Sequence, residues 1–116
     1  MIPKKGNYST NEINTGMLWI DEKPIYRKVI SIGSLPSNTS ITINHNISNI
    51  KNIVNSSLNW FDTSDNAWFN SRWDSTTIYI SYNISPKSIW IKASGSNWGR
   101  RTKDAYAIIE YTKTTD

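Results

Sequence analysis

Apolar and polar residues alternate with a period of two in residues 77–82 and 89–93, as they do in strands that bury one face. Shorter runs of the same kind recur along the chain, separated by turn-forming residues at fairly even spacing. This pattern predicts seven strands, over residues 16–20, 25–32, 39–44, 50–60, 76–83, 88–94 and 104–112. Breaks between them are expected at residues 33–38, 61–65, 85–86 and 94–97.

Only residues 43–54 carry apolar side chains at the helical spacings of three and four. The same window holds four Asn, and its isoleucines are β-branched, so its helix propensity is poor. We interpret it as a strand, a turn at His45-Asn46 with room for a single helical turn, and a second strand. Asn46 is a candidate for left-handed backbone geometry. The fold class predicted for the chain is therefore all-β, an antiparallel β-sandwich of jelly-roll type.

The composition favours one domain that shares a buried face with other copies. At 116 residues the chain has room for a single domain, which we place at residues 8–116 after a linker stub at residues 1–7. Only 37% of the residues are hydrophobic, whereas Asn, Ser and Thr together make up 41 of 116. Six Trp and six Tyr offset this, because each large aromatic side chain buries much apolar area. Burial of a strand face between copies would suit such a chain, so an oligomer is expected.

Charge and cysteine content argue against several classes of function. The chain has no Cys, which excludes disulfides, thiolate metal sites and cysteine nucleophiles. The net charge of +4 is spread along the sequence, which is a weak signal for nucleic acid. No apolar run approaches the ~20 residues of a membrane span. We expect neither a nucleic-acid partner nor membrane insertion.

Catalytic and metal-binding chemistry has little support in the sequence. His45 is the only histidine, a zinc site needs three or four ligands, and no serine lies in a Gly-x-Ser-x-Gly elbow. Asp62, Asp65 and Asp74 could supply the paired carboxylates of glycoside hydrolysis. Aspartates in such stretches more commonly accept backbone hydrogen bonds in turns. We therefore expect a protein that is not an enzyme, with no catalytic residue, no metal and no cofactor.

Clustered tryptophans give the strongest indication of a binding site. A sugar ring offers apolar C–H faces beside hydroxyl groups, so its binder needs flat aromatic rings next to polar side chains. Arginines could pair with phosphate or carboxylate groups on such a glycan. Trp19, Trp60 and Trp90 are embedded in apolar strands and are expected in the core. The predicted glycan-binding residues lie in polar segments and are Trp68, Trp73, Trp98, Asp65, Asn66, Arg72, Arg100 and Arg101.

Three segments of the chain together resemble one known module. The first is Tyr8-Ser-Thr-Asn-Glu12, followed by Gly16 and by Trp19-Ile-Asp-Glu-Lys-Pro-Ile-Tyr-Arg-Lys28, a hairpin arm whose turn ends at Pro24. The second is Ile43-Asn-His-Asn-Ile-Ser-Asn-Ile50, and the third is Ala105-Tyr-Ala-Ile-Ile-Glu-Tyr-Thr-Lys-Thr-Thr-Asp116. They are similar to the start, middle and end of a module at the C-terminal ends of tail-fibre and receptor-binding proteins from phages and prophages of low-GC Gram-positive bacteria.

Two departures from the module affect what can be carried over. The module usually has Asp-Gly and His-Gly where this chain has Asp21-Glu22 and His45-Asn46. Because Glu adopts positive φ poorly, we expect the first turn to differ in type. Residues 59–72 match no part of the module, so no binding residue is assigned from the resemblance.

The resemblance implies a β-sandwich head that assembles as a homotrimer at the tip of a virion tail fibre, outside the cell. Its partner would be a polysaccharide or teichoic acid on the bacterial surface, bound without cleavage. One alternative is a structural domain that trimerises or caps a fibre. Another is the non-catalytic C-terminal module of a tailspike or lysin whose enzyme domain lies upstream.

Overall fold

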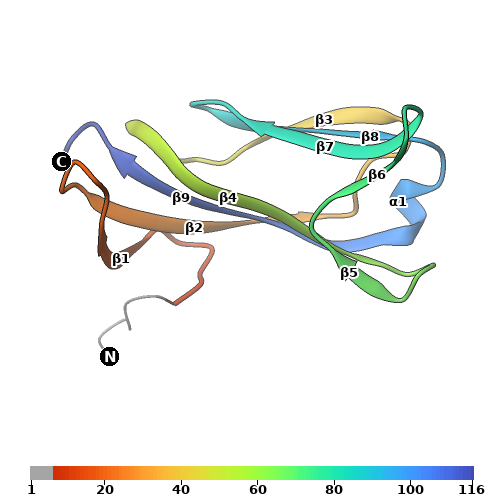
Figure 1. Cartoon of the computed structure of the whole chain (residues 1–116), viewed down its shortest axis with the longest axis horizontal. Helices are drawn as coiled ribbons and strands as arrows, with labels where there is room; N and C mark the ends of the chain where they lie inside the picture. The colour runs from red at the N-terminus through yellow and green to blue at the C-terminus, as the bar shows by residue number, and fades with distance from the viewer. Residues whose placement is uncertain (1–6) are drawn as a thin grey trace.

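The computed structural model describes residues 7–116, which form nine antiparallel strands and one short helix (Figure 1). The expected linker stub at residues 1–7 lies outside the described residues, apart from Asn7. The elements in chain order are β1 (Ile13–Leu18), β2 (Pro24–Gly33), β3 (Thr39–Asn44), β4 (Ile50–Asp62), β5 (Ala67–Phe69), β6 (Arg72–Ser75), β7 (Ile78–Ile84), β8 (Ser88–Ser94), α1 (Trp98–Arg101) and β9 (Thr102–Lys113).

The all-β class is confirmed, with two antiparallel sheets. The strands predicted at residues 39–44 and 88–94 have the bounds of β3 and β8, and the other five are shifted or extended by a few residues. Two strands, β5 and β6, were not predicted, because three or four residues are too few to show a period of two. The helical turn also lies elsewhere, at α1 rather than after His45.

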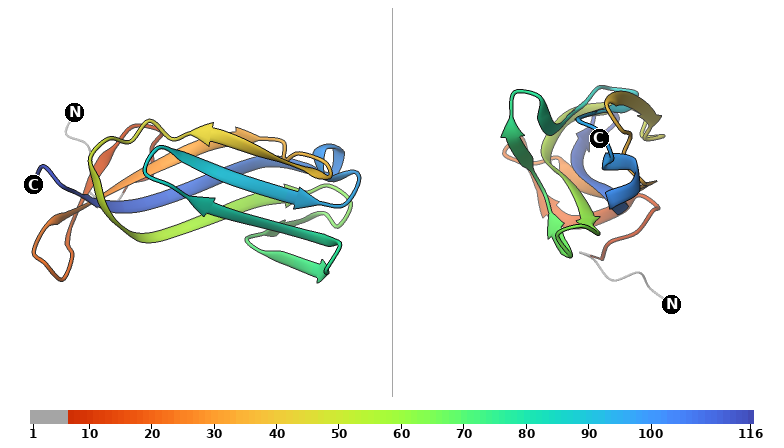
Figure 2. Two further views of the ribbon diagram at one scale, coloured as in Figure 1. Left: turned by 90° about the horizontal axis from the view of Figure 1, so that it is seen from above. Right: turned by 90° about the vertical axis from the view of Figure 1, so that its right-hand side faces the viewer.

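The two sheets lie one over the other (Figures 1 and 2). The five-stranded sheet has the order β1-β2-β9-β4-β5, and the four-stranded sheet has the order β3-β8-β7-β6. In each sheet a strand from the first half of the chain pairs with one from the second half. β2 pairs with β9 in the five-stranded sheet, and β3 pairs with β8 in the four-stranded sheet. Near one end of the molecule, β5, β6 and α1 lie together (Figure 1).

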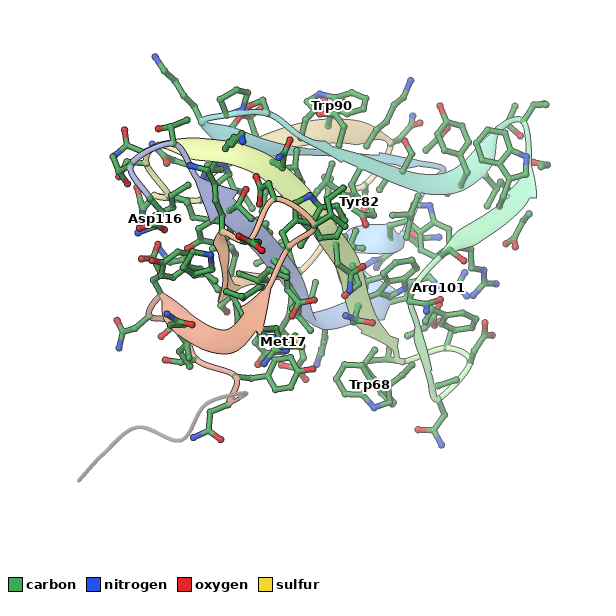
Figure 3. All side chains as sticks on the ribbon, turned by 60° about the vertical axis from the view of Figure 1, so that its left-hand side comes forward. Met17, Trp68, Tyr82, Trp90, Arg101 and Asp116 are labelled. Atoms are coloured by element: carbon green, nitrogen blue, oxygen red, sulfur yellow. The ribbon has the colours of Figure 1, made fainter. Side chains whose placement is uncertain are left out.

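One hydrophobic core lies between the sheets and takes residues from both. From the five-stranded sheet it includes Trp60, Ala107 and Ile109, and from the four-stranded sheet Ile89 and Ile91, all at most 1% exposed. The Tyr82 side chain also points between the sheets (Figure 3), where its hydroxyl lies 3.2 Å from Ser56 Oγ of β4. Alternate residues of β7, β8 and β9 therefore face this shared core, and the residues between them face outward.

The connections between strands rely on asparagine and histidine side chains. Asn46 has a φ of 56°, which confirms the left-handed geometry expected there. His45 beside it is fully buried: its Nδ1 accepts the Ile47 N–H, and its Nε2 lies 2.9 Å from the Ser85 carbonyl oxygen. Its imidazole thus links the loop after β3 to the turn after β7, which is a structural role.

The turn between β1 and β2 differs from what we expected. Glu22 has a φ of 67° and so takes the left-handed conformation that favours glycine. Asp21 Oδ1 accepts the Lys23 N–H at 3.0 Å, and the Trp19 carbonyl oxygen accepts the Glu22 N–H at 2.9 Å. These bonds hold the turn although a side chain stands where glycine would be less strained.

The only helix within residues 7–116 has four residues, too few to cross a membrane.

Replacing Ile91 with alanine tests the shared core. Ile91 is fully buried on β8, and large-to-small changes at such positions cost about 2–5 kcal/mol. We expect Ile91→Ala to lower the free energy of unfolding in urea by that amount. Ile53 on β4 is 38% exposed, so Ile53→Ala should lower it by less than about 1 kcal/mol. Equal effects of the two changes would contradict this assignment of the core.

Candidate functional site

The three tryptophans predicted to bind a glycan lie in three different places. Trp68 on β5 is 60% exposed and packs edge-on against Phe61, 5.4 Å between ring centroids, on the outer face of the five-stranded sheet. Trp73 on β6 is 65% exposed and belongs to the four-stranded sheet. Trp98, the third of them, is only 1% exposed.

Trp98 is buried because its loop folds tightly around it. Gly95 and Asn97 have φ angles of 113° and 74°, and they turn the chain so that the Trp98 indole donates from Nε1 to the Ser94 carbonyl oxygen at 2.7 Å. A Cβ on Gly95 would lie 3.1 Å from this nitrogen. The guanidinium carbons of Arg101 and Arg72 lie 4.7 and 5.5 Å from the indole centroid. The ring is thus a structural anchor with no face open to a ligand.

Next to this indole lies a group of five charged side chains, which we term the ion-pair cluster. Its members are Asp62, Asp65, Arg72, Asp74 and Arg101. The Asp62 carboxylate is fully buried and accepts from Arg101 at 2.9 Å and from Arg72 at 3.3 Å. Arg72 also donates to Asp65 at 2.7 Å and to Asp74 at 3.1 Å.

Electrostatics hold the ion-pair cluster in its charged form. Burial by itself would raise the pKa of Asp62, but hydrogen bonds from Arg101 and from the backbone N–H groups of Asp65 and Ser64 outweigh it and lower that pKa. The pKa of Arg72 is raised, mainly by its bond to Asp74. Both guanidinium groups are therefore neutralised within the protein, and neither is available as the cation that we predicted for a ligand.

The two remaining predicted residues stand apart from the ion-pair cluster's bonds. Arg100 is exposed and donates to Asn97 Oδ1 at 2.8 Å. Asn66 is exposed in the turn between β4 and β5, where its φ of 52° places it in the left-handed region. The structure thus gathers Asp65, Arg72 and Arg101 but does not bring Arg100 or Asn66 into the same network.

A different surface has the properties that the sequence analysis sought, on the outer side of the four-stranded sheet. On β8, Ile89, Ile91 and Ala93 are fully buried, so the intervening Trp90 and Lys92 face outward. Figure 3 shows the Trp90 ring above this sheet and Trp68 on the opposite side of the molecule. Trp90, expected in the core, is half-buried.

Neighbouring strands complete this surface, which we term the aromatic face. Trp73 is the cross-strand partner of Tyr79, and their rings stack with centroids 4.4 Å apart. Polar residues fill the remaining outward positions, because Lys92 pairs with Ser81 and Ser40 while Trp90 pairs with Asn83 and Thr42. The aromatic face therefore consists of Trp73, Tyr79, Trp90, Lys92, Ser40, Thr42, Ser81 and Asn83.

The signal that locates the aromatic face was present in the sequence. Successive side chains of a strand over residues 89–93 point to opposite faces of the sheet, which places Trp90 on the same face as Lys92 and on the other face from the isoleucines. We assigned Trp90 to the core from its apolar neighbours, although a period of two puts those neighbours on the other side of the sheet. Trp19, also expected in the core, is half-buried, and Trp60 alone of the three is fully enclosed, at 1% exposed.

The aromatic face has flat rings beside short hydroxyl and amide groups, a combination that suits apolar ring faces carrying polar substituents. Among residues 7–116 no three His, Cys, Asp or Glu side chains converge as a metal site would require. Comparison of the chain with protein-family models, curated proteins and solved structures finds no match.

Replacing Asp62 with asparagine tests the ion-pair cluster. Removing one partner of a buried ion pair typically costs 3–5 kcal/mol, and we expect roughly 3 kcal/mol at pH 7, because Arg72 and Arg101 keep Asp65. The folded-state pKa of Asp62 is lowered, so its contribution is present above the unfolded value of about 3.9 and is lost as pH falls through the folded-state pKa.

Urea titrations of both proteins from pH 7 to pH 2 measure this effect. The difference between wild type and Asp62→Asn should shrink below about pH 4. Asp74 is 43% exposed, so Asp74→Asn should cost less than about 1 kcal/mol. A difference between wild type and Asp62→Asn that is independent of pH would contradict the role given to this carboxylate.

Proposed function

We propose that this chain is the receptor-binding C-terminal head domain of a bacteriophage tail fibre, and that it binds polysaccharide or teichoic acid on the host surface at the fibre tip. One observation carries the proposal: Trp73 on the edge strand β6 is 65% exposed and stacks on Tyr79 of β7, beside the polar residues of the outer sheet face. Large aromatic rings gathered on a surface commonly mark a binding site. The resemblance of residues 8–28, 43–50 and 105–116 to tail-fibre modules supplies the class of protein.

Binding without cleavage is supported by the state of the carboxylates. Glycoside hydrolysis needs a pair of carboxyl groups, one of which is protonated at working pH and so has a raised pKa. Asp62 and Asp65 accept from Arg72 and Arg101, and Asp74 accepts from Arg72. The pKa of Asp62, the buried member, is lowered. These groups suit a structural role better than acid catalysis.

We further propose that the two sheets form a jelly-roll-like β-sandwich that assembles as a homotrimer. The pairing of β2 with β9 and of β3 with β8, together with the shared core, supports the sandwich. Exposed apolar side chains outside the aromatic face support assembly, because burying them between copies would remove them from water. They are Trp68 at 60% exposed, Leu18 at 62% and Ile20 at 87%.

A purely structural capping role for the domain is favoured by the last residues of β1 and the turn that follows it. Met17, Leu18 and Ile20 expose apolar side chains within four residues, and this suits a contact with protein better than one with a glycan. If the domain only ended a fibre, this turn would carry its function and the aromatic face would not.

Alanine substitution at the aromatic face tests receptor binding. We expect Trp73→Ala to weaken binding to host cells by about tenfold or more, since aromatic anchors dominate binding energies. Cell pull-down over a panel of low-GC Gram-positive bacteria measures it. Tyr106→Ala is the control, because it removes an exposed aromatic side chain from the outer face of the five-stranded sheet. Unchanged binding by folded Trp73→Ala, Tyr79→Ala and Trp90→Ala variants would overturn the proposal.

Light scattering after size exclusion tests the homotrimer. We expect a mass of three times the 13.3 kDa of one chain. Replacing Ile20 or Trp68 with aspartate should shift the protein toward the monomer if those side chains are buried between copies. A monomer at every concentration would contradict assembly by this chain, and a trimer that binds no cells would favour the capping role.

A further inference from the structure

We infer that the aromatic face binds an extended anionic glycan that lies along β8, with Lys92 contacting a negative group between two aromatic platforms. The platforms are Trp90 on one side and the stacked Trp73–Tyr79 pair on the other. The inference rests on the proposed function and adds to it the class of glycan and the residue that selects that class.

Strand register fixes the order of these side chains along the sheet. Tyr79 lies opposite Ser94, and Asn83 lies opposite Trp90, so four residues of β8 separate the two platforms. At about 3.4 Å per residue the platforms are roughly 14 Å apart, and Lys92 is midway between them. One sugar ring cannot reach both platforms, so the face fits several consecutive units of a chain.

The charge of Lys92 is not neutralised by a neighbouring acid. Its cross-strand neighbours are Ser40 and Ser81, and no ion pair within residues 7–116 includes it. The only acidic residue on the strands of the four-stranded sheet is Asp74, which Arg72 holds at 3.1 Å. Lys92 Nζ lies 5.8 Å from the Tyr79 ring centroid, beside the platform itself.

This arrangement selects for charge on the ligand. A cation on an otherwise uncharged surface favours a ligand whose negative group reaches it, because opposite charges across an interface set specificity. Phosphate or carboxylate groups on the glycan would both serve, since the lysine ammonium acts as a point charge without a fixed fork geometry. Lys92, rather than the ion-paired Arg72 and Arg101, is thus the residue that distinguishes an anionic glycan from a neutral one.

A single-stranded nucleic acid also has flat rings and negative charge, but it fits this face less well. Grooves that follow a nucleic-acid backbone contact successive phosphates with several basic residues. The described strands of the four-stranded sheet have only Arg72 and Lys92, and Arg72 is turned into the ion-pair cluster. One available cation between two ring platforms matches a polymer of mixed sugar and anionic groups better.

Binding of Lys92→Gln to an array of purified bacterial surface glycans tests the inference, with neutral, carboxylated and phosphate-bearing glycans represented. The wild type should bind anionic glycans preferentially, and added salt should weaken that binding. Lys92→Gln should lose about tenfold in affinity for anionic glycans, as expected for a lost charged hydrogen bond, and should lose most of the salt dependence. Lys103→Gln, which removes the same charge from the five-stranded sheet, should behave as the wild type.

Failure of this inference can be told from failure of the proposed function. If Trp73→Ala loses cell binding while Lys92→Gln retains it, the anionic class is wrong and the receptor-binding role stands. If Trp73→Ala, Tyr79→Ala and Trp90→Ala all leave cell binding unchanged, the role itself is overturned. A wild type that binds neutral glycans equally well, or no glycan on the array, also contradicts the inference. Tighter binding to an oligothymidylate than to any glycan would identify the ligand as nucleic acid instead.

Discussion

The rest of the structure depends on one buried carboxylate. Asp62 ends β4 of the five-stranded sheet, Arg72 begins β6 of the four-stranded sheet, and Arg101 ends α1 just before β9. A single acidic group therefore joins the two layers and the helix at one end of the molecule. A buried charge is costly unless it is paired, so the two guanidinium groups are fixed as firmly as the carboxylate. The Trp98 indole packs beside both guanidinium groups.

The same strand builds the core and the proposed binding surface. On β8 the inward side chains are Ile89, Ile91 and Ala93, while Trp90 and Lys92 lie on the other side of the backbone. Because a close-packed core permits little movement, the outward side chains inherit its rigidity. The backbone positions of the platforms and of Lys92 are then held at fixed spacing, and stacking of Trp73 on Tyr79 orders one platform further, which suits recognition of a regularly repeating polymer.

Local patterns predicted the fold class and most of the strands, because a period of two needs only neighbouring residues. They could not predict β5 and β6, whose three or four residues are polar or aromatic in no regular order. They also misplaced Trp98, because its burial depends on the turn at Gly95 and Asn97 and on contacts with residues far from it in sequence, such as Arg72. Arg72 and Arg101 looked like solvent-facing cations for the same reason. The aromatic face, in contrast, could have been predicted from local sequence. The period of two around Trp90 places this side chain on the outer face of the sheet, but we assigned it to the core because its neighbours are apolar. The resemblance to tail-fibre modules stays a prediction.

The place of β9 in the five-stranded sheet has a consequence for biosynthesis. This strand lies between β2 and β4 and supplies Ala105, Ala107 and Ile109 to the core, yet the ribosome makes it after all of the other strands. Until it emerges, β2 and β4 have no strand between them to pair with, and the core lacks the side chains that β9 supplies. Folding must then close contacts between distant parts of the chain, which is intrinsically slow and leaves strand edges exposed in the meantime. A nascent chain that stops before β9 lacks the strand that joins β2 to β4. Only chains translated through β9 can therefore reach the native state.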